Sequence, residues 1–180
     1  MTADPEDGAS RHRLSAYLAT LAGGMNAIGT VWIFVLMVLV NADVLGREAF
    51  SSPVRGVTEI LSLSIVAIVF MQLSHTLWVG RITRSDALLA RLIKNWPGLG
   101  HGLDALFHLT GAGLFAVIAW ASLPYIQRAF STGEYVGAFG DFTAPTWPVR
   151  LIIVIGSIVT GASFLALAWQ RARLIIGSGR

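Results

Sequence analysis

The chain of 180 residues contains no cysteine, and its charged residues are few. Without cysteine it can form no disulfide, thiolate metal site, iron–sulfur cluster or covalently attached c-type haem, and it has no nucleophilic thiol. Charged residues make up 13% of the chain and hydrophobic residues 54%, whereas an ordinary soluble domain is about 25% charged. The composition therefore excludes an ordinary soluble globular domain.

The motifs of several enzyme classes are also missing. The sequence contains no G-x-S-x-G, no H-E-x-x-H, no P-loop and no Rossmann glycine pattern. The pI is near 10, but the net charge is only +3 and no RNA-binding motif accompanies it. We therefore expect no enzyme activity, no metal or other cofactor, and no nucleic-acid partner.

Four long stretches carry no Asp, Glu, Lys or Arg: residues 14–42, 60–80, 105–127 and 151–170. Each can cross a hydrocarbon layer of about 30 Å, which takes roughly 20 helical residues. The sequence predicts an all-α integral membrane protein with four transmembrane helices, at about 16–45, 54–79, 101–130 and 147–172. Residues 1–13 are expected to form a polar cytoplasmic tail, and residues 14–180 a single membrane domain.

The first apolar stretch exceeds the core of a signal peptide, which is about 7–15 residues long, and its acidic start lacks a basic leader. We interpret it as a retained membrane helix. Small residues in the last two apolar stretches indicate close helix packing. They are Gly111, Gly113, Gly156, Ser157, Gly161 and Ala162.

Lys and Arg are distributed unevenly between the segments that join these helices. Nine would lie on one side of the membrane: Arg11, Arg13, Arg81, Arg84, Arg91, Lys94, Arg171, Arg173 and Arg180. Four would lie on the other: Arg47, Arg55, Arg128 and Arg150. By the positive-inside rule both termini and the middle loop are cytoplasmic, and the two remaining loops face outward.

A fifth, amphipathic helix is expected at residues 84–96, between the second and third transmembrane helices. One face would carry Leu88, Leu89, Leu92, Ile93 and Trp96, and the other Arg84, Asp86, Arg91, Lys94 and Asn95. It is too short to span the bilayer, and a basic amphipathic helix of this kind lies at the membrane surface. We predict an interfacial arm on the cytoplasmic side.

Charged residues cluster around the first outward turn: Asp43, Arg47, Glu48, Arg55 and Glu59. Asp43 and Arg47 are four residues apart, as are Arg55 and Glu59, so each pair can meet on one helix face. Because Glu59 falls inside the second helix, its carboxylate needs a partner, for which Arg47 is the candidate. Two interpretations fit: charges that hold the turn, or groups that take part in ion or proton transfer.

Two histidines offer an alternative. His75 and His108 fall at similar depth near the cytoplasmic ends of antiparallel helices. A bis-histidine haem requires that arrangement, so a small b-type cytochrome is the competing hypothesis.

Two short motifs flank the second apolar stretch. Before it, Arg47 and the aromatic Phe50 precede Gly56-Val57-Thr58-Glu59. After it, Gly80-Arg81-Ile82-Thr83-Arg84-Ser85-Asp86 leads into Leu88 and Leu89. In order and placement the chain resembles the small membrane subunit (DctQ-type) of tripartite ATP-independent periplasmic (TRAP) transporters. The family's typical Gly-Arg-His-Ile-Arg-Val-Asp is matched at Gly80, Arg81, Arg84 and Asp86, while Ile82 and Ser85 replace the histidine and valine.

The resemblance implies a three-part secondary transporter of the bacterial inner membrane. A periplasmic binding protein would capture a carboxylate-type solute, and a large membrane subunit (DctM-type) would move it together with sodium. The small subunit would bind no substrate, would brace the large subunit and would help to dock the binding protein. The residues implied in subunit or binding-protein contacts are Arg47, Phe50, Arg55, Gly56 and Glu59.

Overall fold

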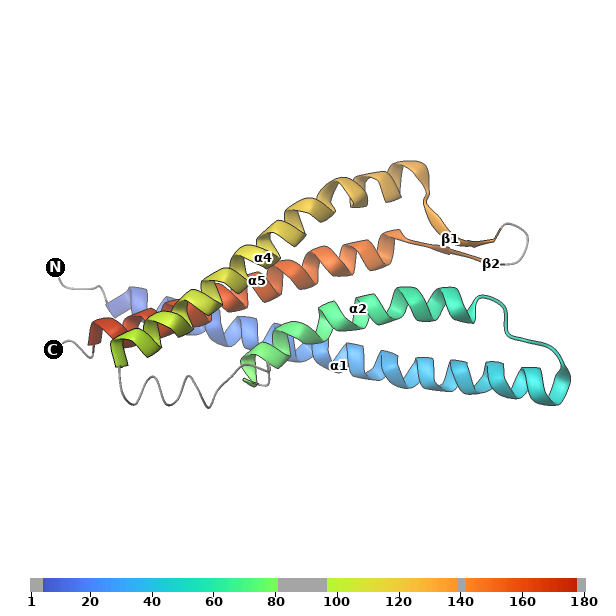
Figure 1. The fold of residues 1–180 in the computed structure, drawn as a ribbon, viewed down its shortest axis with the longest axis horizontal. Helices are drawn as coiled ribbons and strands as arrows, with labels where there is room; N and C mark the ends of the chain where they lie inside the picture. Colours follow the sequence, from blue (N-terminus) through green and yellow to red (C-terminus); the bar gives the residue numbers. More distant parts are fainter. Residues whose placement is uncertain (1–4, 81–96, 139–141, 178–180) are drawn as a thin grey trace.

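The structure, a computed structural model, describes residues 5–80, 97–138 and 142–177. Its elements, in chain order, are α1 (Pro5–Phe50), α2 (Val57–Trp78), α4 (Pro97–Thr132), β1 (Tyr135–Ala138), β2 (Phe142–Pro145) and α5 (Trp147–Gly177) (Figure 1). Four stretches are long and apolar enough to cross a membrane: Ser15–Phe50, Val57–Trp78, Gly102–Thr132 and Trp147–Gln170. The four predicted spanning helices are confirmed, whereas the interfacial arm lies outside the described residues.

The first helix is longer than predicted at both ends. It begins at Pro5, inside the expected polar tail, and proline suits a first helical position because its missing N–H would have no intrahelical acceptor. It continues to Phe50, five residues beyond the predicted end. The second helix begins at Val57 because Gly56 adopts a left-handed backbone conformation with φ 77°.

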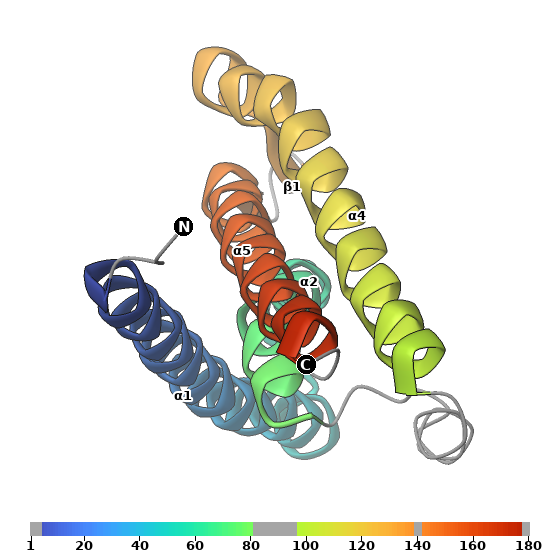
Figure 2. The same cartoon turned by 90° about the vertical axis from the view of Figure 1, so that its left-hand side faces the viewer.

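Helix α5 lies at the centre of the bundle. It packs against α4, α2 and α1, while α1 and α2 form one hairpin and α4 and α5 the other (Figure 2). The start of α1 and the end of α5 lie at one end of the bundle, which we call the terminal end (Figure 1). The opposite end, which carries the turn between α1 and α2 and the two strands, is called the turn end.

Small residues let the helices around α5 come close together. A Cβ atom at Gly156 would lie 2.6 Å from the carbonyl oxygen of Phe70 on α2, and one at Gly111 would lie 2.7 Å from the Phe164 ring. By contrast, no atom of the described residues lies within 4 Å of a Cβ at Gly113, so the packing predicted there is wrong. Leu77, Ala112, Phe115 and Phe164 form the core cluster where α2, α4 and α5 meet.

Hydroxyl groups add hydrogen bonds inside this bundle. Ser74 of α2 and Ser163 of α5 are both fully buried, with their oxygens 2.9 Å apart, and the indole N–H of Trp78 also donates to Ser163 over 3.0 Å. Between α1 and α2, the indole of Trp32 donates to Ser64 over 3.0 Å. Polar side chains therefore link α2 to both of its neighbours within the membrane-spanning part of the chain.

The loop between α4 and α5 is not purely irregular, which corrects the all-α prediction in this detail. Strands β1 and β2 pair antiparallel, with Tyr135 opposite Pro145 and Ala138 opposite Phe142. Gly137 has φ 120°, and a Cβ there would lie 2.1 Å from the Phe142 carbonyl oxygen. The ladder therefore depends on a position that only glycine fits.

Candidate functional site

The buried carboxylate of Asp43 organises the turn between α1 and α2. Its Oδ2 accepts hydrogen bonds from Arg47, with Nε at 3.0 Å and Nη2 at 2.7 Å. Its Oδ1 accepts the backbone N–H of Val54 over 2.9 Å. The pairing predicted between Asp43 and Arg47 is confirmed, and we call these three residues the Asp43 clasp.

The backbone reverses direction tightly beyond the clasp. Ser51 adopts a positive φ of 50°, and the N–H of Ser52 donates to the carbonyl of Gly46 over 3.0 Å. A Cβ at Gly46 would lie 2.7 Å from the carbonyl oxygen of Ser52, so glycine is what lets the returning chain run against α1. The return is therefore held by backbone contacts as well as by the clasp.

These contacts define a projecting segment, residues 44–56, which we call the α1 tip. The clasp places Val54 beside Asp43, while α1 continues for two further turns to Phe50, about 10 Å at 1.5 Å per residue. The Phe50 side chain is 78% exposed and that of Arg47 57% exposed. The predicted contact residues Arg47 and Phe50 thus lie in the last turn of α1, and the end of α1 extends beyond the start of α2 at the turn end (Figure 1).

The start of α2 holds the other predicted contact residues. Arg55 is exposed and Glu59 is half-buried in the first turn of α2. The pairing of Arg47 with Glu59 is wrong: in the part of the chain that the structure describes, Arg47 binds Asp43 and forms no ion pair with Glu59. The reason is that α1 extends beyond the start of α2. Arg47 lies one turn beyond Asp43 toward the end of α1, whereas Glu59 lies inside α2, on the other side of the level of Asp43.

The two loops of the turn end touch at Gly56. A Cβ atom there would overlap the ring of Phe142, at 2.1 Å, so the first residue of β2 packs directly on the glycine. The left-handed backbone of Gly56 and this contact both require a residue without a side chain. The β-hairpin and the α1 tip therefore form one connected surface.

Arg150 fastens the second loop and was not singled out by the sequence reasoning. Its Nη2 forms an ion pair with Glu134, its Nη1 donates to the carbonyl of Tyr125 over 2.5 Å, and its guanidinium lies 5.6 Å from the Tyr125 ring centroid. Arg150 and Tyr125, together with Ser122 and Ile153, line a cavity of about 190 Å³. The available signal was an arginine in the first turn of a membrane helix, where a nearby loop acid is the expected partner.

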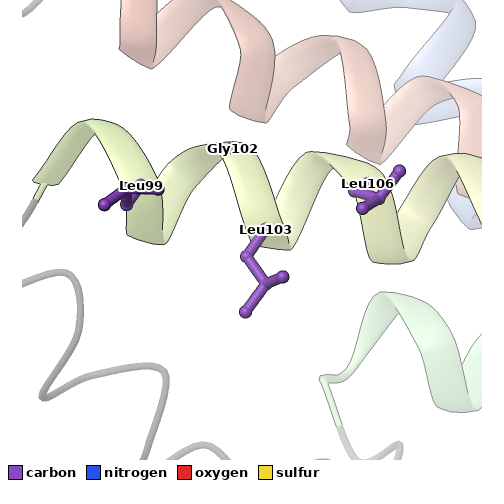
Figure 3. A pocket seen from close by; sticks show the side chains of 4 residues that line it. All are labelled: Leu99, Gly102, Leu103 and Leu106. Carbon is purple, nitrogen blue, oxygen red and sulfur yellow. The ribbon is translucent and has the colours of Figure 1, made fainter.

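The predicted arm residues lie mostly outside the described part of the chain. Gly80 follows the C-cap residue of α2 and has φ 69°. The others, Arg81, Arg84, Asp86, Leu88, Leu89, Leu92 and Trp96, are not described. On α4, Leu99, Leu103 and Leu106 are more than half exposed around Gly102 and line an open pocket, and Leu103 points away from α5 (Figure 3). The terminal end of α4 thus presents an apolar face.

The two histidines of the alternative hypothesis are packed differently. His108 is buried, its Nδ1 lies 2.7 Å from the Asp104 carbonyl oxygen, and the Phe164 ring centroid is 6.0 Å from that of His108. His75 is half-buried in the last turn of α2. Phe164, which packs on His108, belongs to the core cluster at the junction of α2, α4 and α5. Nothing in this arrangement favours a haem site.

Four spanning helices with a braced, charged turn end define a multi-pass membrane protein. A family model described as "Tripartite ATP-independent periplasmic transporters, DctQ component" matches residues 36–174. The chain therefore belongs to this family and is a small membrane component of a TRAP transporter. No curated protein and no solved structure matches the chain. The matched range includes the clasp, the α1 tip, the β-hairpin and all but the last three residues of α5.

Proposed function

We propose that this chain is the scaffold subunit of a TRAP-type secondary transporter of the bacterial inner membrane. It carries no substrate itself, braces the large membrane subunit (DctM-type), and helps to dock a periplasmic binding protein for sodium-coupled uptake of a carboxylate-type solute. Both termini face the cytoplasm, so the turn end faces the periplasm. The proposal rests first on membership of the family.

The observation that carries the scaffold role is the uneven burial of the helices. In the most apolar stretch of α5, 44% of the residues are buried, against 17% in those of α1 and α4. Most residues in these stretches of α1 and α4 are therefore accessible to lipid or to another protein. A subunit that braces a larger membrane protein needs such faces.

The positions of the ionisable groups support the proposal that this chain does not itself form the path of the solute. In the described spans they lie near the helix ends: Asp43, Arg47, Glu48, Glu59, His75, Asp104, His108, Arg128 and Arg150. A path for a carboxylate or an ion through the bilayer normally uses charged or polar groups at mid-depth. The centres of these four spans carry no Asp, Glu, Lys, Arg or His.

The interfacial arm is part of the same proposal. Leu88, Leu89, Leu92 and Trp96 would be buried in the cytoplasmic headgroup region or against the large subunit, continuing the apolar face that Leu99 and Leu103 begin on α4. Single cysteines at these positions should resist a water-soluble thiol reagent in intact membranes. Free labelling at all four would contradict the arm.

The test of the proposed function is purification of the tagged chain in mild detergent from its native membrane, with the visible spectrum recorded on the same sample. We expect a large hydrophobic polypeptide to copurify and the spectrum to show no haem band. Recovery of the chain alone, with a Soret band lost when His75 or His108 is replaced, would make it a cytochrome instead.

A further inference from the structure

The lengths of α1 and α2 place the α1 tip relative to the bilayer. Helix α2 has 22 residues, a length of about 33 Å at 1.5 Å per residue, close to the hydrocarbon thickness of about 30 Å. Its first residue, Val57, therefore lies near the periplasmic boundary of the hydrocarbon. The spanning stretch of α1 has 36 residues, so α1 extends well past α2.

The Asp43 clasp determines how much of that excess lies at the turn end. Val54, three residues before the start of α2, is bound to Asp43. Asp43 therefore marks the point on α1 that lies just beyond the start of α2 on the periplasmic side. From there α1 rises about 10 Å to Phe50. Each headgroup layer adds about 5–8 Å to the hydrocarbon core. Phe50 thus reaches the outer limit of the headgroups, where lipid tails cannot cover its ring.

A large apolar side chain held there gains free energy when a protein surface covers it. Phe50 has the highest exposure, 78%, among the large hydrophobic residues that the structure describes. The clasp and the contact between Gly46 and Ser52 restrain the tip, so little ordering is needed when a partner binds. Aromatic residues, phenylalanine among them, and arginine are enriched in the cores of protein interfaces.

We propose that Phe50 is the anchor by which the water-soluble binding protein docks on the transporter. The inference rests on the proposed function. The soluble component reaches only what projects from the bilayer, and among the described residues of the turn end the tip projects farthest (Figure 1). Arg47 adds charge complementarity, because Nη1 has no partner among the described residues while Nε and Nη2 hold Asp43. The docking surface would be an apolar socket for the Phe50 ring, bordered by a carboxylate.

The first test is site-specific photocrosslinking in membranes that contain the whole transporter. Phe50 is replaced by the photoreactive residue p-benzoylphenylalanine, and Trp120 of α4 serves as the matched control because it is 76% exposed but lies in the middle of a spanning stretch. We expect light to join the Phe50 position, and not the Trp120 position, to the binding protein identified by mass spectrometry. A crosslink from position 50 to the large subunit, to a second copy of the chain or to lipid only would overturn the inference.

The second test measures affinity. The complex of both membrane subunits is placed in nanodiscs, and binding of the fluorescently labelled binding protein is titrated with Phe50→Ala and Trp120→Ala variants. We expect Phe50→Ala to weaken binding by about tenfold or more, as for an interface anchor, and Trp120→Ala to leave binding unchanged. If the large subunit copurifies normally but Phe50→Ala binds like the wild type, the anchor is wrong and the scaffold role stands. If no large subunit copurifies with the wild type, the scaffold role itself fails.

Discussion

Helices α5 and α1 use similar apolar sequences for opposite purposes. Both are long enough to span a membrane, but the most apolar stretch of α5 is 44% buried and that of α1 is 17% buried. Helix α5 contacts all three of the other spanning helices, while α1 packs mainly on α2. Hydropathy therefore identifies both as membrane helices without showing which one organises the chain.

The difference lies in the small and hydroxylated residues of α5. Gly156 permits close approach of α2, and Ser163 joins two side chains of α2. On α1, by contrast, nothing lies within 4 Å of a Cβ at Gly23 or Gly24. The interior of the subunit is thus built on α5, and the face of α1 is left for lipid or a partner.

Gly156→Ala should have the largest effect on stability. The added methyl would meet the backbone of Phe70 at 2.6 Å, which a side-chain rotation cannot relieve. Overpacking of this kind costs about 1–3 kcal/mol, so the melting temperature of the purified chain should fall. Gly113→Ala is the matched control: its Cβ meets nothing within 4 Å, and replacing a helical glycine by alanine gains about 0.5–1 kcal/mol. Equal shifts for the two variants would mean that α5 is not the packing axis.

Ser163→Ala should come next, because it removes the group shared by Ser74 and Trp78. Hydrogen bonds between membrane helices contribute about 0.6 kcal/mol each on average, so the loss should be about 1 kcal/mol. Ser62→Ala is the control, since that exposed hydroxyl bonds only to the Thr58 carbonyl of its own helix. Thermal unfolding in detergent measures both, and a Ser163 variant as stable as the Ser62 variant would contradict the role of this node.

The contrast also explains what the sequence alone could predict. Uncharged stretches gave the four helices because length and hydropathy decide membrane insertion. The pairing of Asp43 with Arg47 followed from helical spacing within one helix. The ion pair between Arg150 and Glu134 was missed because it joins a loop to a later helix.

The errors at the turn end have the same origin. The sequence does not show how far α1 extends beyond the start of α2, so Arg47 was wrongly paired with Glu59. That distance is set by the hydrogen bond between Asp43 and Val54, a contact between segments. The β-hairpin was not predicted because its strands have only four residues each, and its position depends on Phe142 packing against Gly56. Contacts between segments leave little periodic signal in the sequence.

Phe142→Ala is expected to have a smaller effect on stability than either of the changes in the bundle interior. The ring is half-buried and covers Gly56, so its removal should loosen the hairpin from the start of α2 while the four helices stay packed. We expect faster amide hydrogen exchange in residues 135–138 and 142–145, and almost no change in melting temperature. Val136→Ala, an exposed neighbour on β1, should leave that exchange unchanged. Unaltered exchange in the Phe142 variant would show that the two loops are not coupled.

The smallest effect on the chain by itself is expected from the double variant Val31→Ala, Val38→Ala on α1. These residues are 65% and 54% exposed, so shortening their side chains removes few contacts within the chain. The free energy of unfolding should change by less than about 0.5 kcal/mol. Val154→Ala on α5, where the side chain is 8% exposed, should cost about 1–2 kcal/mol. The order should reverse when the yield of complex with the large subunit is measured, because the proposed scaffold role assigns the exposed face of α1, and not the buried α5, to the partner. If the α1 double variant leaves that yield unchanged, its exposed face is covered by lipid and the brace must be sought on α4.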